Sequence, residues 1–125
     1  MTASGKKILV AEDDKFLMKV YQSKLKDEGY ELITASDGEE ALAKIKEETP
    51  NLVLLDIMMP KKNGFEVLKE SKSNSKTKGI PIIILSNLGQ DSDINEGVKI
   101  GADDYIIKSN ISINGILEKI EKFIK

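Results

Sequence analysis

The stretch Leu52-Val53-Leu54-Leu55-Asp56 decides the fold class, because four consecutive apolar residues run directly into a carboxylate. A continuously apolar run of this length is typical of a strand that is buried on both faces of a parallel sheet. A carboxylate that ends such a strand is costly to bury unless a cation or a metal ion offsets its charge. The stretch therefore predicts a central strand, Leu52–Asp56, and a charged site at its carboxyl end.

Outward from this stretch, short apolar runs and amphipathic stretches alternate along the chain. Continuously apolar residues also occupy Ile8–Ala11 and Ile82–Leu85, as expected of further strands covered on both faces. Five β-α units in a row imply the doubly wound α/β class, a five-stranded parallel sheet with five helices on its two faces. The predicted strands are Ile8–Glu12, Glu31–Ala35, Leu52–Asp56, Pro81–Ser86 and Asp104–Lys108.

Apolar residues spaced three or four apart predict the five helices. The first ends at Gly29, the second opens at Asp37 and stops before Pro50, the third begins near Gly64, and the fourth ends near Gly101. The apolar positions that mark these helices are, in order, Phe16, Leu17, Val20, Tyr21 and Leu25; Ala41, Leu42 and Ile45; Phe65 and Leu68; Ile94 and Val98; and Ile113, Ile116, Leu117, Ile120 and Ile124.

Charged and hydroxyl side chains follow four of the predicted strands at the point where each strand ends. In doubly wound sheets, ligands bind outside the carboxyl ends of the strands, where the strand order reverses. Acids and one lysine at such a place predict a site that binds a divalent cation and receives a phosphoryl group. The candidate residues are Glu12, Asp13, Asp56, Ser86 and Lys108, whereas Asp14 is expected to cap the following helix.

The composition narrows the chemistry and the partners. The chain has 125 residues, which predicts one domain, 1–125, with residues 1–5 as a disordered lead. It contains no cysteine, no histidine and no arginine, so thiolate sites, imidazole bases and bidentate arginine clamps on phosphate are excluded. The net charge is −2 with lysines spread along the chain, so no direct nucleic-acid binding is expected. No run is long enough for a membrane span, and a cytoplasmic location is expected.

With these residues in this order, the chain resembles a bacterial response-regulator receiver domain over nearly its whole length. The resemblance rests on the acid pair Glu12-Asp13, on Asp56 with a proline four and a glycine eight residues later, and on Ser86, Tyr105 and Lys108. It implies a flavodoxin-like fold with strand order 2-1-3-4-5. It also implies a stand-alone, chemotaxis-regulator-like protein of a two-component system, which is a phosphoprotein switch rather than an enzyme.

The resemblance further implies a role for each candidate residue. Asp56 would accept a phosphoryl group from a sensor histidine kinase, and the Ser86 hydroxyl and Lys108 would contact that group, with Asp56, Lys108 and Ser86 as the catalytic set. Ser86 and Tyr105 would switch the surface of the fourth helix, fifth strand and fifth helix, which an unknown downstream protein reads. The implied Mg²⁺ ligands are Asp13, Asp56 and the backbone carbonyl of Met58, with Glu12 acting through water.

Two alternatives and one departure from the family pattern stand beside this interpretation. A phosphatase of the haloacid-dehalogenase type would also form an aspartyl phosphate, but it typically carries a second aspartate where this chain has Met58. A receiver that is never phosphorylated could act by protein contact alone. Family members usually place a proline after the lysine, often through a cis peptide, whereas here Lys108 is followed by Ser109.

Overall fold

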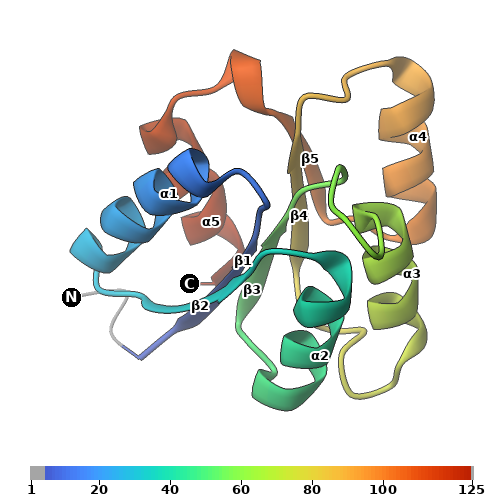
Figure 1. The fold of residues 1–125 in the computed structure, drawn as a ribbon, viewed down its shortest axis with the longest axis horizontal. Helices are drawn as coiled ribbons and strands as arrows, with labels where there is room; N and C mark the ends of the chain where they lie inside the picture. The colour runs from blue at the N-terminus through green and yellow to red at the C-terminus, as the bar shows by residue number, and fades with distance from the viewer. Residues whose placement is uncertain (1–4, 125) are drawn as a thin grey trace.

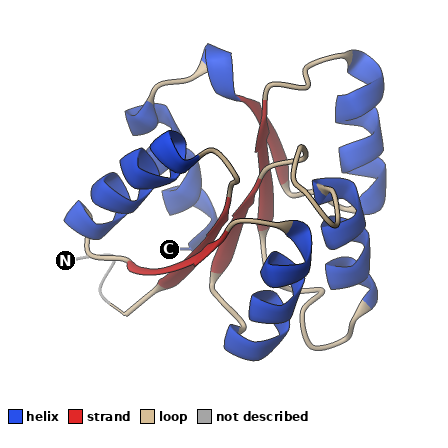
Figure 2. Ribbon diagram, in the orientation of Figure 1, coloured by secondary structure: helices blue, strands red, loops and turns tan. Residues whose placement is uncertain are grey.

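The five strands lie side by side in one parallel sheet, in the order β2-β1-β3-β4-β5. The computed structural model describes residues 5–124, and Figure 2 shows the strands passing through the middle of the molecule with helices on either side. The predicted class and strand order are therefore confirmed. The strands are β1 (Lys7–Ala11), β2 (Glu31–Ala35), β3 (Leu52–Leu55), β4 (Ile82–Ser86) and β5 (Asp104–Ile107).

The helices divide between the two faces of the sheet. Helices α1 and α5 cover one face, and α2, α3 and α4 cover the other (Figure 1). Successive strand side chains point to opposite faces, so alternate residues of each central strand enter two separate apolar clusters. The helices are α1 (Lys15–Asp27), α2 (Gly38–Glu48), α3 (Gly64–Ser73), α4 (Asp91–Ile100) and α5 (Ile113–Ile124), with a short 3₁₀ helix, η1 (Lys108–Asn110).

The helix starts are built from local capping contacts, as the sequence predicts. The Asp14 carboxylate accepts hydrogen bonds from the backbone N–H groups of Phe16 (2.9 Å) and Leu17 (3.1 Å), so Asp14 is confirmed as the cap of α1. Asp37 caps α2 in the same way, accepting from the N–H of Glu40 at 2.8 Å. These caps satisfy orphan N–H groups and hold each helix at the sheet edge where the preceding strand ends.

Three of the apolar residues that mark α1 and α4 in the sequence, Phe16, Val20 and Val98, do not face inward. Phe16 is 74% exposed, Val20 37% and Val98 59%. In α1 the inner stripe runs through Leu17, Tyr21 and Leu25, at strict four-residue spacing. Residues one position earlier on a helix are rotated by about 100°, so Phe16 and Val20 lie on the flank of α1.

Three of the predicted strands end one residue later in the prediction than in the structure. The backbone N–H of Asp56 still donates to the carbonyl of Ala11 (3.1 Å), but β3 itself ends at Leu55. Glu12 likewise donates to Ala35 (3.0 Å) just after β1, and Lys108 begins η1 instead of ending β5. The functional side chains therefore sit immediately beyond the ladder, where the backbone turns away from the sheet.

The sequence also predicts a disordered lead at residues 1–5 and no membrane span. The predicted disordered lead, residues 1–5, falls outside the described residues except for Gly5. Across residues 5–124, no helix combines the length and the apolar character that crossing a membrane requires.

Candidate functional site at the carboxyl edge of the sheet

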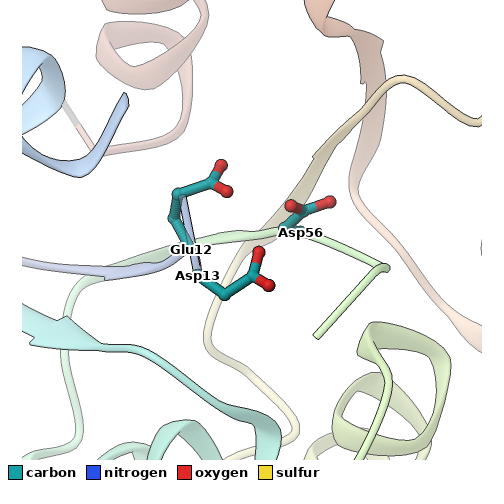
Figure 3. A group of neighbouring side chains, drawn as sticks. All are labelled: Glu12, Asp13 and Asp56. Atoms are coloured by element: carbon teal, nitrogen blue, oxygen red, sulfur yellow. The ribbon is translucent and has the colours of Figure 1, made fainter. Parts of the chain in front are cut away.

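Three carboxylates gather where β1 and β3 end. Glu12, Asp13 and Asp56 each offer an oxygen that lies within 4.8 Å of the others, and Figure 3 shows the three side chains meeting from the two strand ends. Glu12 and Asp56 are buried, at 3% and 6% exposure, whereas Asp13 is exposed. Because β1 and β3 are neighbouring parallel strands, their carboxyl ends meet at the same edge of the sheet.

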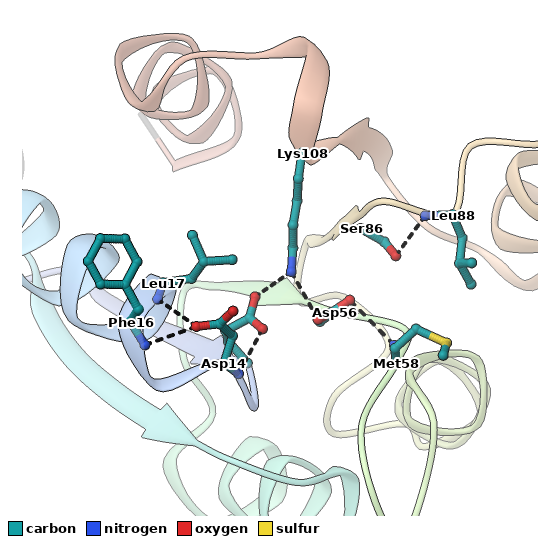
Figure 4. Close-up of polar contacts among 9 residues, drawn as sticks. Asp14, Phe16, Leu17, Asp56, Met58, Ser86, Leu88 and Lys108 are labelled. Atoms are coloured by element: carbon teal, nitrogen blue, oxygen red, sulfur yellow. Dashed lines mark hydrogen bonds and ion pairs between the residues drawn. The ribbon is translucent and has the colours of Figure 1, made fainter.

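Lys108 brings a positive charge to the same place from the carboxyl end of β5, two strands away from β3 in the sheet. Its Nζ donates to Glu12 Oε1 at 2.6 Å and to Asp56 Oδ2 at 3.0 Å (Figure 4). The sequence led us to expect the pairing with Asp56. The shorter contact with Glu12 was not anticipated, because nothing in a linear sequence indicates which of two nearby acids a lysine contacts first.

Burial and pairing shift the pKa values of this ion cluster. Burial raises the pKa of the Glu12 carboxyl, against the opposing effects of Lys108 and of the Asp14 N–H. Burial alone would lower the pKa of Lys108, but its bonds to the Glu12 and Asp56 carboxylates outweigh that effect and raise it. Lys108 is therefore held as an ammonium beside Asp56.

The donor set of the cluster suits a hard divalent cation. Three carboxylates and one ammonium carry formal charges of −3 and +1, which leaves −2 to be compensated. All three acids offer oxygen ligands, and Mg²⁺ prefers a few carboxylates together with retained waters. The exposed position of Asp13 leaves this side of the cluster open to solvent.

The loop after Asp56 is held close against the sheet. The Met58 N–H donates to Asp56 Oδ1 at 3.4 Å, while the Met58 side chain is 63% exposed. A Cβ at Gly64 would overlap the backbone carbonyl oxygen of Asp56, so only glycine fits there. The start of α3 and the loop therefore share the space directly behind Asp56.

The two predicted switch residues, Ser86 and Tyr105, both hydrogen-bond to the backbone of one residue, Leu88. The buried Ser86 Oγ accepts from the N–H of Leu88 at 3.2 Å (Figure 4). The Tyr105 hydroxyl donates to the carbonyl of Leu88 at 2.5 Å. Leu88 thus links the two side chains, a connection that sequence reasoning missed because Leu88 contributes only its backbone.

The peptide bond after Lys108 is trans, and Ser109 stands where the family pattern has a proline. No cis peptide occurs among residues 5–124, so the Lys108–Ser109 bond is trans. Ser109 continues the 3₁₀ turn of η1 and is exposed.

A family comparison agrees with this geometry. Residues 8–121 match the family model described as the response regulator receiver domain. Among curated proteins, the chain is 45% identical over 108 residues to the probable transcriptional regulator ycf27 of Cyanophora paradoxa, covering 86% of this chain and 44% of that protein. The chain spans about half the length of the curated relatives it matches.

Solved structures give the same picture of the fold. The chemotaxis protein CheY4 of Vibrio cholerae superposes with a TM-score of 0.87 at 30% identity, covering 94% of this chain and 98% of that chain. The BeF₃-activated receiver domain of RstA from Klebsiella pneumoniae superposes with a TM-score of 0.88 at 28% identity, covering 96% and 99%.

Proposed function

Since this chain belongs to the response regulator receiver domains and is a phospho-accepting switch of the two-component type, we propose that Asp56 is the residue that receives the phosphoryl group. One observation carries the proposal: the Lys108 ammonium bridges Asp56 and Glu12 at 3.0 and 2.6 Å, with Asp13 beside them. Of the three acids, Asp56 is the one that also receives the N–H of Met58.

The proposed reaction is an in-line transfer from a phosphohistidine of a sensor histidine kinase. A carboxylate oxygen of Asp56 attacks phosphorus as the P–N bond to the donor imidazole breaks, and the bonding electrons leave with the imidazole. Lys108 then contacts a phosphoryl oxygen, and the Ser86 hydroxyl donates to another. Catalysis of this kind consists mainly of positioning and charge stabilisation. The chain thus assists only its own phosphorylation and dephosphorylation, and we do not assign it a turnover reaction on another substrate.

Mg²⁺ is the proposed cofactor. Asp13, Asp56 and the Met58 carbonyl would hold it, with Glu12 acting through a water molecule. When bound, the ion supplies positive charge beside the phosphoryl oxygens. The formal charge of −2 left by the three acids and Lys108 supports this assignment.

The proposed output surface consists of α4, β5 and α5. A phosphoryl group adds about −1.5 to −2 charges and strong acceptor oxygens. Ser86 ends β4 and can bind these oxygens only for particular positions of the loop that follows it, and Leu88 in that loop accepts a hydrogen bond from Tyr105 on β5. Phosphorylation therefore favours one arrangement of the surface around Tyr105, which a downstream protein reads.

The phosphatase alternative is not supported by the site. The position two residues after Asp56 holds Met58, whose apolar side chain points to solvent and offers no acid or base. The contact-only alternative is separated from the proposal by the experiment that follows.

We test the proposal by labelling with a small phosphodonor, such as acetyl phosphate, in the presence of Mg²⁺. Measured by the mass of the intact protein, the wild-type chain is expected to gain one phosphoryl group and the Asp56→Asn variant is expected to gain none. Asp14→Asn is the matched control, because asparagine also caps helices and Asp14 lies outside the acid cluster. A wild-type chain that stays unlabelled, or an Asp56→Asn variant labelled like the control, would refute the assignment.

A further inference from the structure

The loop between β4 and α4, residues 87–90, lies directly against the side chain of Ile107. A Cβ at Gly89 would lie 3.1 Å from Ile107 Cδ1, 3.6 Å from Cγ1 and 3.7 Å from Cγ2, and these are the nearest atoms that it would meet. Gly89 is not among the glycines with a positive φ, so its backbone conformation does not require glycine. The close approach of the loop to Ile107 does, because a carbon atom at 3.1 Å from Cδ1 would be closer than an ordinary van der Waals contact.

Ile107 stands between the two side chains that would contact the phosphoryl group. In the pairing of β4 with β5 it lies opposite Ser86, and in the chain it directly precedes Lys108. Within residues 5–124, its side chain belongs to neither of the two apolar clusters on the faces of the sheet. Filling the core therefore does not account for a large aliphatic residue at this position, whereas contact with the loop does.

Two hydrogen bonds hold the same loop at the site. The Leu88 N–H donates to Ser86 Oγ at 3.2 Å (Figure 4), and the Leu88 carbonyl accepts from the Tyr105 hydroxyl at 2.5 Å. The other three residues of the loop, Asn87, Gly89 and Gln90, are exposed. In the free chain, the loop can therefore lift slightly from Ile107 toward solvent at little cost.

The proposed function takes this freedom away. When the Ser86 hydroxyl donates to a phosphoryl oxygen on Asp56, the loop that follows Ser86 is held at one distance from β5. A contact changes the affinity for the phosphoryl group only if its free energy differs between the free and the bound state. The contact between the loop and Ile107 differs in this way, because only the bound state prevents the loop from lifting.

We propose that Ile107 is a positioning residue, whose side chain supports the loop when Ser86 reaches the phosphoryl group, and that Gly89 allows the loop to approach it. This inference rests on the proposed function and deepens it. Neither residue touches the phosphoryl group. A larger side chain at position 89 would push the loop away from β5, and a smaller one at position 107 would leave the loop without support, so both changes should weaken binding of the phosphoryl group.

An exchange of side-chain size tests this contact. Gly89→Val adds as many carbon atoms as Ile107→Ala removes, so the double variant conserves the volume of the pair. The measurement is the binding of beryllofluoride, an unreactive analogue of the phosphoryl group, to the full chain in saturating Mg²⁺. We expect each single variant to weaken binding by about tenfold, and the double variant to bind at least about threefold more tightly than either single variant.

Gly79→Val is the matched control, because a Cβ at Gly79 meets no atom within 4 Å. Adding Ile107→Ala to Gly79→Val should weaken binding as much as Ile107→Ala does alone. The inference would be overturned if the losses of Gly89→Val and Ile107→Ala multiplied in the double variant, or if both single variants bound like wild type. Absence of binding by wild type would overturn the proposed function, and the inference with it.

A second measurement separates positioning of Ser86 from a general loss of packing. If Gly89→Val acts by keeping Ser86 away from the phosphoryl group, adding Ser86→Ala to it should weaken beryllofluoride binding by no more than about twofold. In the Gly79→Val chain, Ser86→Ala should cost as much as it does in wild type. A full further loss from Ser86→Ala in the Gly89→Val chain would contradict the proposal, whatever the stability of the variants.

Discussion

At the scale of single residues, the chemistry of this protein is concentrated in one lysine and the acids around it. Lys108 is 96 positions from Glu12 and 52 from Asp56 in the sequence, yet it contacts both. Its side chain is 12% exposed, and its two partners are more buried still. Removing the Lys108 ammonium would leave these two carboxylates buried with no compensating charge.

Lys108→Ala is therefore expected to lower the free energy of unfolding by about 2–4 kcal/mol at neutral pH and low Mg²⁺. Urea denaturation measures this loss. Lys119→Ala is the control, because Lys119 pairs with Asp104 at 3.4 Å on the surface and should contribute less than about 1 kcal/mol. Equal losses in the two variants would show that the Lys108 pairs are not stabilising. Phosphorylation by acetyl phosphate should also slow in Lys108→Ala and not in Lys119→Ala.

At the scale of elements, the site depends on how tightly helices and loops approach the ends of the strands. The α3 start lies against the Asp56 backbone, and the start of α2 lies equally close to the loop before α3, where a Cβ at Gly38 would overlap the carbonyl oxygen of Lys62. The N–H of Gly38 also donates to Pro60 at 3.1 Å. These two glycines allow two helices to close on the loop that carries Met58.

Gly64→Ala tests this close approach. The added methyl would meet backbone atoms of Asp56 and Ile57, which cannot move aside without distorting the acid cluster. We expect a loss of about 2–4 kcal/mol in the free energy of unfolding. Gly79→Ala is the control, because a Cβ there meets no atom within 4 Å. It should be neutral or stabilising by up to about 1 kcal/mol. Comparable stabilities of the two variants would contradict the account of the α3 start.

At the scale of the whole molecule, the fold places an exposed apolar surface beside the acid cluster. Phe16 and Val20 on α1 and Ile113 on α5 line a shallow groove of about 420 Å³, together with Lys19, Ser23 and Lys24. The Phe16 backbone N–H donates to Asp14, the residue after Asp13, so the start of α1 connects the groove with the acid cluster. Isolated apolar side chains on a surface are ordinary, but a continuous exposed apolar groove is typical of a contact surface, so we expect the donor kinase of the proposed function to contact it.

Phe16→Ala is expected to slow phosphotransfer from a histidine kinase at least fivefold, because truncation of one aromatic contact residue commonly costs about 1–2 kcal/mol of binding. Labelling by acetyl phosphate should stay within about twofold of wild type, because this small donor does not use the groove. Val98→Ala is the control, because Val98 is similarly exposed on α4, away from this groove. Both variants should unfold at nearly the wild-type temperature. A Phe16→Ala variant that accepts phosphate from the kinase as fast as Val98→Ala does would remove the groove from the proposed docking surface.

Much of this molecule could be predicted from local patterns. The apolar run before Asp56 predicted a doubly covered central strand, since a strand buried on both faces tolerates few polar residues, and β3 is indeed buried throughout. Asp14 and Asp37 were recognisable as helix caps, because a cap is satisfied by backbone N–H groups only two or three residues away. The candidate residues at the strand ends followed from the same strand pattern, whereas the strand order and the role of each residue followed from the resemblance to receiver domains.

Only the tertiary structure decided which distant groups meet. The bond of Lys108 to Glu12 and the joining of Ser86 and Tyr105 through Leu88 both depend on how the layers pack. The exposure of Phe16 also depends on packing, because the apolar positions of α1 locate its inner stripe only to within one residue and packing selects the final rotation. Local hydrogen bonds and burial patterns are written in neighbouring residues, whereas pairings across the sheet exist only after the chain has folded.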